Sequence, residues 1–159
     1  MNPRRSQRVN THVGDRKDER PPVVLLVDDD PVVRDIIAWV IQSTGYTPVT
    51  ADGAEGFRHL TELADRVALV LLDLTMHSLD GFRFRELQLA QPRLADVPTV
   101  VMSGRYVEHE ERAKLGARDY VWKPIKISEL RAVITEHARP LTALAGVASA
   151  AAAPAARTA

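Results

Sequence analysis

The 159-residue chain contains no cysteine. This excludes a disulfide framework, a thiol nucleophile and a metal site built on cysteine. Long apolar runs are also missing, because the Ala-rich stretch 141–153 is shorter than the ~20 residues that a membrane-spanning helix needs. Residues 1–20 are polar and charged and lack the apolar segment of a secretory signal. These absences predict a cytoplasmic protein without a membrane span.

The chain has no net charge, but its charges are unevenly distributed. Residues 1–20 hold six basic and three acidic residues, so the remainder is mildly acidic, which argues against direct binding of nucleic acid. With few apolar residues, 1–20 is predicted to be a disordered basic tail. Residues 140–159 are mostly alanine and are predicted to be a low-complexity tail. One domain is expected between them, at 21–139.

Between the tails, short apolar runs alternate with amphipathic segments. The alternation predicts an α/β fold, a doubly wound parallel (βα)5 sheet with the flavodoxin-like strand order 2-1-3-4-5. The strand 46–50 contains a proline, which favours an edge position. The expected strands are 23–27, 46–50, 68–72, 98–102 and 119–122, and the expected helices are 31–44, 53–64, 81–90, 107–115 and 126–138. The inward stripes of the first and last helices are predicted to be Val33, Ile36, Ile37, Val40 and Ile41, and Ile127, Leu130, Ile134 and Ala138.

Polar side chains stand where four of the predicted strands end. Asp28 and Asp29 follow the first strand, Asp73 follows the third, Ser103 the fourth and Lys123 the fifth. Because the carboxyl ends of neighbouring parallel strands meet at one edge of the sheet, these residues are expected in one crevice. The sequence therefore predicts three acids, one hydroxyl and one ammonium in a single site.

This set of side chains suits a divalent metal and a phosphoryl group. Three carboxylates repel one another unless a cation neutralises them, and Mg²⁺ prefers oxygen ligands. Asp73 is the best nucleophile, since a carboxylate can accept a phosphoryl group to form an acyl phosphate. Lys123 would pair with phosphoryl oxygens, and the Ser103 hydroxyl could donate to the same group.

Each of these residues also has a plainer interpretation. An aspartate after a strand can cap the next helix or form a turn, and capping is the preferred interpretation for Asp30. Ser103-Gly104 can be an ordinary turn, and Lys123-Pro124 can be a connector. The functional interpretation is preferred because all four strand ends carry residues that metal-dependent phosphoryl chemistry requires.

Four segments together resemble the receiver domain of two-component response regulators, over about Val23 to Ala138. The segments are VVLLVDDDPVVR at 23–34, VLLDLTMHSLDGF at 70–82, VVMSG at 100–104 and GARDYVWKP at 116–124. Their order and spacing agree with the family. In that family the Lys-Pro peptide bond is usually cis.

The resemblance implies a phosphoacceptor signalling module that assists its own phosphotransfer and dephosphorylation, and not a separate enzyme. Asp73 would accept a phosphoryl group from a phosphohistidine on a sensor kinase or a histidine phosphotransfer protein. Mg²⁺ would be held by Asp29 and Asp73 directly, by Asp28 directly or through water, and by the backbone carbonyl of Thr75. Lys123 would bind the phosphoryl group.

The resemblance also implies a conformational switch. Ser103 would turn toward the phosphoryl group and Tyr120 would change rotamer. The surface formed by 107–115, 119–122 and 126–138 would then bind a downstream protein target. Thr75 and Arg105 each lie two residues beyond a site residue and would tune the lifetime of the acyl phosphate.

Two positions depart from the family pattern. His77 stands where the family usually has proline, which leaves the loop after Asp73 less rigid; a metal-binding role for His77 stays an alternative. Trp122 is unusually bulky, and both a partner-facing and a half-buried position are open for it.

Several functions compete. The leading hypothesis is a stand-alone receiver that signals by phosphorylation-controlled protein binding or phosphorelay. The alternatives are the receiver head of a longer regulator, with 140–159 as a truncated linker, and a receiver-like adaptor that does not switch. A haloacid dehalogenase-type phosphatase matches at 28–32, but it needs further acids after its lysine, and here only Glu129 and Glu136 follow. An FMN flavodoxin is disfavoured because the first β-α turn is acidic.

Overall fold

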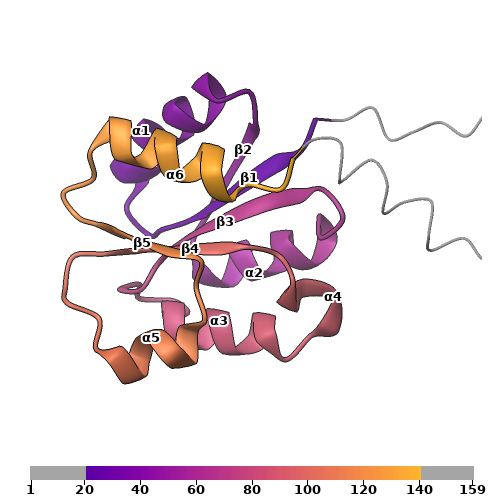
Figure 1. The fold of residues 1–159 in the computed structure, drawn as a ribbon. Helices are drawn as coiled ribbons and strands as arrows, with labels where there is room; N and C mark the ends of the chain where they lie inside the picture. Colours follow the sequence, from indigo (N-terminus) through magenta and orange to yellow (C-terminus); the bar gives the residue numbers. More distant parts are fainter. Residues whose placement is uncertain (1–20, 141–159) are drawn as a thin grey trace, which may run out of the picture.

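The computed structural model describes residues 21–140 and shows a five-stranded parallel sheet between two layers of helices (Figure 1). The strand order is β2-β1-β3-β4-β5, which confirms the predicted fold class and places the proline-containing strand at an edge. The strands are β1 (Val23–Val27), β2 (Thr47–Ala51), β3 (Val67–Asp73), β4 (Thr99–Ser103) and β5 (Asp119–Trp122). The predicted tails lie outside the described residues, apart from Pro140.

Within the described part of the chain, two helices cover one face of the sheet and four cover the other (Figure 1). The first layer consists of α1 (Pro31–Ser43) and α6 (Ile127–His137). The second consists of α2 (Gly53–Glu62), α3 (Gly81–Leu89), α4 (Pro92–Ala95) and α5 (His109–Leu115). The short α4 was not predicted, because four residues are too few to show a helical period. Within residues 21–140, no helix is long and apolar enough to cross a membrane.

The central strands are apolar on both faces because helices cover both. In β1, Val24 and Leu26 pack in the cluster under α1 and α6, while Leu25 and Val27 pack in the cluster under α2, α3 and α4. All four side chains are fully buried. Strands buried on both faces are continuously hydrophobic, and each such side chain contributes about 1.5–3 kcal/mol on burial.

Aspartates begin the helices that follow β1, β2 and β3. The Asp30 carboxylate accepts hydrogen bonds from the backbone N–H groups of Val32 at 2.8 Å and Val33 at 3.3 Å. Asp52 and Asp80 cap α2 and α3 in the same way. The capping role predicted for Asp30 is therefore confirmed. Asp30 caps α1, which leaves Asp28 and Asp29 as the acids of the predicted site after β1.

Two predicted core residues are exposed instead. Ile36 in α1 is 53% exposed and Ile127 in α6 is 47% exposed. The apolar arc of α1 is wider than the surface that the sheet and α6 cover, so Ile37, Val40 and Ile41 fill the core and Ile36 does not. Val32 and Trp39 are exposed on the same helix.

Candidate functional site

The acids predicted to converge do so at the carboxyl edge of the sheet. Asp28 follows β1 and Asp73 ends β3, and Asp29 stands beside Asp28. Ligand oxygens of these three carboxylates all lie within 4.8 Å of one another. Ser103 ends β4, and its backbone carbonyl accepts the Lys123 N–H at 2.8 Å, which fixes the start of the loop after β5. The structure thus brings all five predicted residues to one edge.

Lys123 bridges two of the acids. Its Nζ donates to Asp28 Oδ2 at 2.9 Å and to Asp73 Oδ2 at 3.0 Å. The Asp28 side chain is fully buried and that of Asp73 is 5% exposed, while Lys123 is 27% exposed. The site therefore holds a largely buried cluster of charges, in which the Lys123 ammonium contacts the carboxylates of both Asp28 and Asp73.

Burial and neighbouring charges have opposite effects on the pKa values of Asp73 and Lys123. Burial raises the pKa of Asp73, although the Thr75 N–H and the Lys123 ammonium favour the ionised carboxylate. For Lys123, burial lowers the pKa, but the two carboxylates outweigh it, so the pKa is raised. Lys123 consequently stays charged, and a desolvated Asp73 gains from any further cation.

Asp29 is the most open of the three acids and is bound by the loop after β3. Its Oδ2 accepts the backbone N–H of His77 at 3.1 Å and also contacts the ring Nδ1 of His77. The hydrogen bond with the imidazole is the main reason why the pKa of Asp29 is lowered. His77, which departs from the family pattern, therefore contacts the predicted metal ligand Asp29, and the His77 side chain is 97% exposed.

The acids fit a magnesium ion by their chemistry and spacing. Asp28, Asp29 and Asp73 offer only hard carboxylate oxygens, the ligands that Mg²⁺ prefers. Lys123 contacts Asp28 and Asp73 but not Asp29, so a dication at this edge would further reduce the repulsion among the three carboxylates. Thr75 follows in the same loop, where its N–H donates to Asp73 Oδ1 at 3.1 Å.

Gly81 fixes the distance between α3 and the loop after β3. A Cβ at this position would lie 2.4 Å from the Asp73 carbonyl oxygen and 2.7 Å from Leu74 Cα. Only glycine permits this approach, and the Gly81 N–H donates to the Leu74 carbonyl at 3.2 Å. Gly81 thus helps to position Asp73, a role that the Asp80-Gly81 turn signal did not reveal.

The Ser103 hydroxyl is turned to its own loop. It donates to the Arg105 carbonyl at 2.8 Å and accepts the Arg105 N–H at 3.2 Å. The Arg105 guanidinium pairs with Glu111 in α5 at 2.8 Å. Glu111 was not identified from the sequence, because nothing in its spacing from Arg105 signals an ion pair.

Tyr120 lies half-buried under α5. Its hydroxyl donates to the Arg112 carbonyl at 3.4 Å, and the Arg112 guanidinium carbon lies 4.3 Å from the ring centroid. Burial raises the pKa of the phenol. Next to it, Trp122 is 37% exposed and stacks on Tyr106 with ring centroids 6.4 Å apart. Trp122 is therefore partly packed and partly open to solvent.

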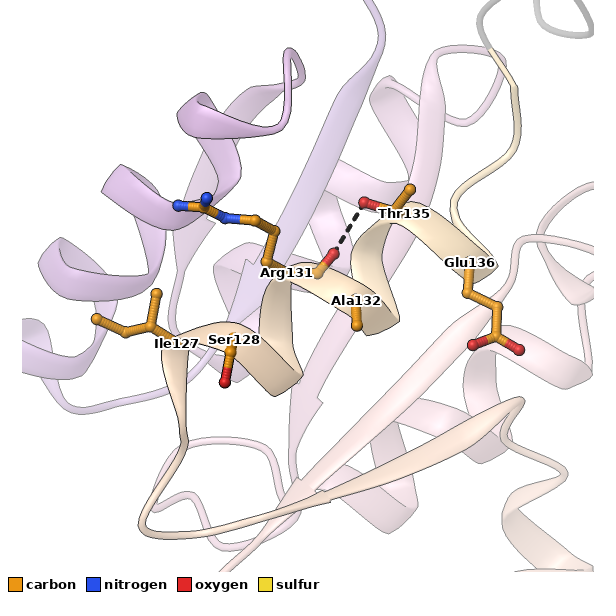
Figure 2. A pocket seen from close by; sticks show the side chains of 6 residues that line it. All are labelled: Ile127, Ser128, Arg131, Ala132, Thr135 and Glu136. Carbon is orange, nitrogen blue, oxygen red and sulfur yellow. Dashed lines mark hydrogen bonds between the residues drawn. The ribbon is translucent and has the colours of Figure 1, made fainter.

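Two hollows border α6. One of about 730 Å³ lies along the outer side of α6 (Figure 2), where the Thr135 hydroxyl donates to the Arg131 carbonyl at 2.9 Å, and no acid of the site lines it. The other, of about 310 Å³, is apolar and lies between α1 and the loop after β5. The residues that line the second hollow include Ile36, Ile127 and Lys123, so it borders the site.

Comparison with known proteins agrees with this geometry. A family model described as the response regulator receiver domain matches residues 24–135. The DNA-binding dual master transcriptional regulator RpaA of Synechocystis is 30% identical over 114 residues, which cover 70% of this chain and 46% of that protein. The transcriptional regulatory protein GlrR of Escherichia coli is 34% identical over 110 residues, 67% of this chain and 24% of that protein. The chain thus spans about half or less of these relatives.

Solved structures show the same fold. A response regulator receiver protein from Pseudomonas putida has a TM-score of 0.65 and 31% identity, covering 74% of this chain and 98% of that one. The receiver domain of the sensor histidine kinase PA1611 from Pseudomonas aeruginosa has a TM-score of 0.64 and 26% identity, with 74% and 98% covered, and holds magnesium in its active site cleft. The family model, the fold and the acidic edge agree, and the chain belongs to the response regulator receiver domain family.

Proposed function

We propose that the protein is a phosphorylation-controlled signalling module in which Asp73 accepts a phosphoryl group. The observation that supports this most strongly is the contact of one lysine with two buried aspartates, beside a third acid, at the edge where the strands end. Burying a carboxylate without a partner costs free energy. A fold that gathers several of them beside a lysine is therefore suited to binding a cation and a transferred anion.

The proposed reaction is a phosphoryl transfer to a carboxylate. A carboxylate oxygen of Asp73 bonds to phosphorus, the N–P bond of a phosphohistidine breaks, and the electron pair stays on the imidazole nitrogen of the donor. Asp28, Asp29 and Asp73, with the Thr75 carbonyl, would hold Mg²⁺. When bound, the ion neutralises the charge that develops on the phosphoryl oxygens. Lys123, already beside Asp73 Oδ2, would bind one of those oxygens.

The switch proposed for this site uses residues of the adjoining loops. Ser103 would leave the Arg105 carbonyl and donate to the phosphoryl group, and Tyr120 would change rotamer. The surface formed by α5, β5 and α6 would then bind a downstream protein. Thr75 and Arg105, both exposed beside the site, would set how readily water reaches the acyl phosphate.

The proposed donor is a sensor histidine kinase or a histidine phosphotransfer protein, and the proposed compartment is the cytoplasm. A stand-alone receiver that binds a protein target, without direct contact to nucleic acid, is the favoured form. A second form is the receiver part of a longer regulator. It is favoured by one observation, that the chain matches only 24–46% of the length of the relatives described above.

Phosphoramidate with and without Mg²⁺ tests the proposal, with intact mass as the readout. We expect one Mg²⁺-dependent phosphoryl adduct on the wild type and none on Asp73→Asn. Asp80→Asn is the matched control, since Asp80 caps α3 and an asparagine can keep that bond. An adduct that persists in Asp73→Asn would refute the assignment of the phosphoacceptor.

A further inference from the structure

We propose that Glu111 is a positioning residue, which holds the Ser103 hydroxyl on its own loop through Arg105 and so opposes the switch. The inference rests on the proposed function, because it concerns how readily Ser103 reaches a phosphoryl group on Asp73. It assigns the regulation of the site to an ion pair outside it.

The Ser103 hydroxyl is held by hydrogen bonds within its own loop. A serine hydroxyl has one proton to donate, and here it donates to the Arg105 carbonyl at 2.8 Å. The same hydroxyl accepts the Arg105 N–H at 3.2 Å. To donate to a phosphoryl oxygen, Ser103 must leave the Arg105 carbonyl, so whatever fixes the Arg105 backbone opposes that movement.

The Arg105 side chain is anchored to the first turn of α5. Its guanidinium makes a two-pronged contact with Glu111, with Nη2 at 2.8 Å from Oε1 and Nη1 at 3.0 Å from Oε2. Nη1 also donates to the Tyr106 carbonyl at 2.9 Å, which ties the side chain to the backbone of the same loop. Planar two-pronged pairs of arginine and carboxylate restrict geometry more than single contacts do.

Glu111 is itself held in place at the start of α5. Glu111 is the third residue of α5, and its Oε2 accepts the backbone N–H of Glu108 at 2.9 Å, in a capping box. The contact with Arg105 is the main reason why the pKa of Glu111 is lowered to about 2, so the carboxylate stays charged at neutral pH. The first turn of α5, Arg105 and Ser103 therefore form one connected unit.

The test uses Glu111→Gln, which keeps an oxygen for the capping box and removes the charge that holds Arg105. Glu110→Gln is the matched control, because Glu110 is exposed in the same turn and loses the same charge. Both are made in a Trp39→Phe background. The chain has two tryptophans, so Trp122, stacked on Tyr106 of this loop, then reports alone.

The main measurement is the affinity for beryllium fluoride in Mg²⁺, a probe that mimics a phosphoryl group on a carboxylate. We expect Glu111→Gln to bind it about two- to fivefold more tightly than the parent, the range expected for an exposed ion pair, and Glu110→Gln to match the parent. A purely structural role for Glu111 would lower the melting temperature without tightening binding. In a Ser103→Ala background the difference should disappear.

Equal affinities for the two glutamine variants, or a gain that persists in Ser103→Ala, would overturn the inference. Acrylamide quenching of Trp122 without ligand gives a second test, and we expect it to rise in Glu111→Gln only. If the parent protein binds no beryllium fluoride, the proposed function fails. The quenching comparison then decides by itself whether Glu111 holds the loop: equal quenching in the two variants refutes it, and a rise in Glu111→Gln alone supports it.

Discussion

Replacing Lys123 by methionine should destabilise the protein, and more so at pH 7 than at pH 5. The change removes the ammonium that contacts Asp28 and Asp73 and keeps most of the side-chain volume. Asp28 is fully buried, so its carboxyl group would stay in the interior without this partner. Removing one member of a buried ion pair costs about 3–5 kcal/mol, and the 27% exposure of Lys123 reduces this to about 2–3 kcal/mol.

The pH dependence follows from Asp73. Burial already holds its pKa above the ordinary value, and loss of the ammonium should raise it further. A carboxyl whose pKa is higher in the folded than in the unfolded state costs stability above the folded pKa, and this cost shrinks as the pH falls through that value. The deficit of Lys123→Met should therefore be smaller at pH 5 than at pH 7.

Urea unfolding in EDTA at the two pH values measures this effect. With a slope of about 1–3 kcal/mol per molar urea, the midpoint at pH 7 should fall by roughly 1–2 M. Lys126→Met is the control, because Lys126 is exposed and the change in charge is the same. A loss below about 0.5 kcal/mol, the ordinary range of surface substitutions, or an equal loss at both pH values would refute the reasoning.

Three further changes test other parts of the account. Gly81→Ala should lower the free energy of unfolding by about 1–3 kcal/mol, because the added Cβ would lie 2.4 Å from the Asp73 carbonyl oxygen. Gly104→Ala is the control and should cost less, because its Cβ would lie 3.9 Å from Lys123 Cβ. Equal losses in the two variants would contradict this prediction. Mg²⁺ at about 100 times its dissociation constant should stabilise the wild type by about 2.7 kcal/mol in thermal unfolding. Asp29→Asn should weaken this stabilisation, whereas the control Asp30→Asn, at the α1 cap, should keep it. Asp73→Asn should be at least as stable as the wild type at pH 7 in EDTA, since it removes a carboxylate whose pKa burial raises; a marked loss of stability would show that Asp73 is needed for folding.

Much of the fold follows from local patterns in the sequence. The strands are continuous apolar runs, and aspartates mark the starts of α1, α2 and α3, so the order of elements was predictable. The acids and Lys123 were predictable as a cluster because parallel strands end at a common edge. The exposure of Ile36 and Ile127 could not be predicted, because periodicity shows which helix face is apolar but not how much of that face a neighbouring element covers.

The contacts that tune the site were beyond the sequence patterns. Arg105 and Glu111 are exposed or half-exposed charges six positions apart across a loop and a helix start, and no local spacing rule pairs them. His77 reaches Asp29 from a different strand end, 48 residues away. Such contacts depend on loop conformation, which apolar periodicity does not describe.

Locating the acyl phosphate within the chain tests the central claim most directly. After phosphorylation with phosphoramidate and Mg²⁺, borohydride reduces an aspartyl phosphate to homoserine, which tandem mass spectrometry can place at one residue. The account predicts homoserine at position 73 alone, beside the lysine that contacts its carboxylate. Homoserine at Asp28 or Asp29, or a phosphoryl group that resists borohydride on a histidine or serine, would contradict it.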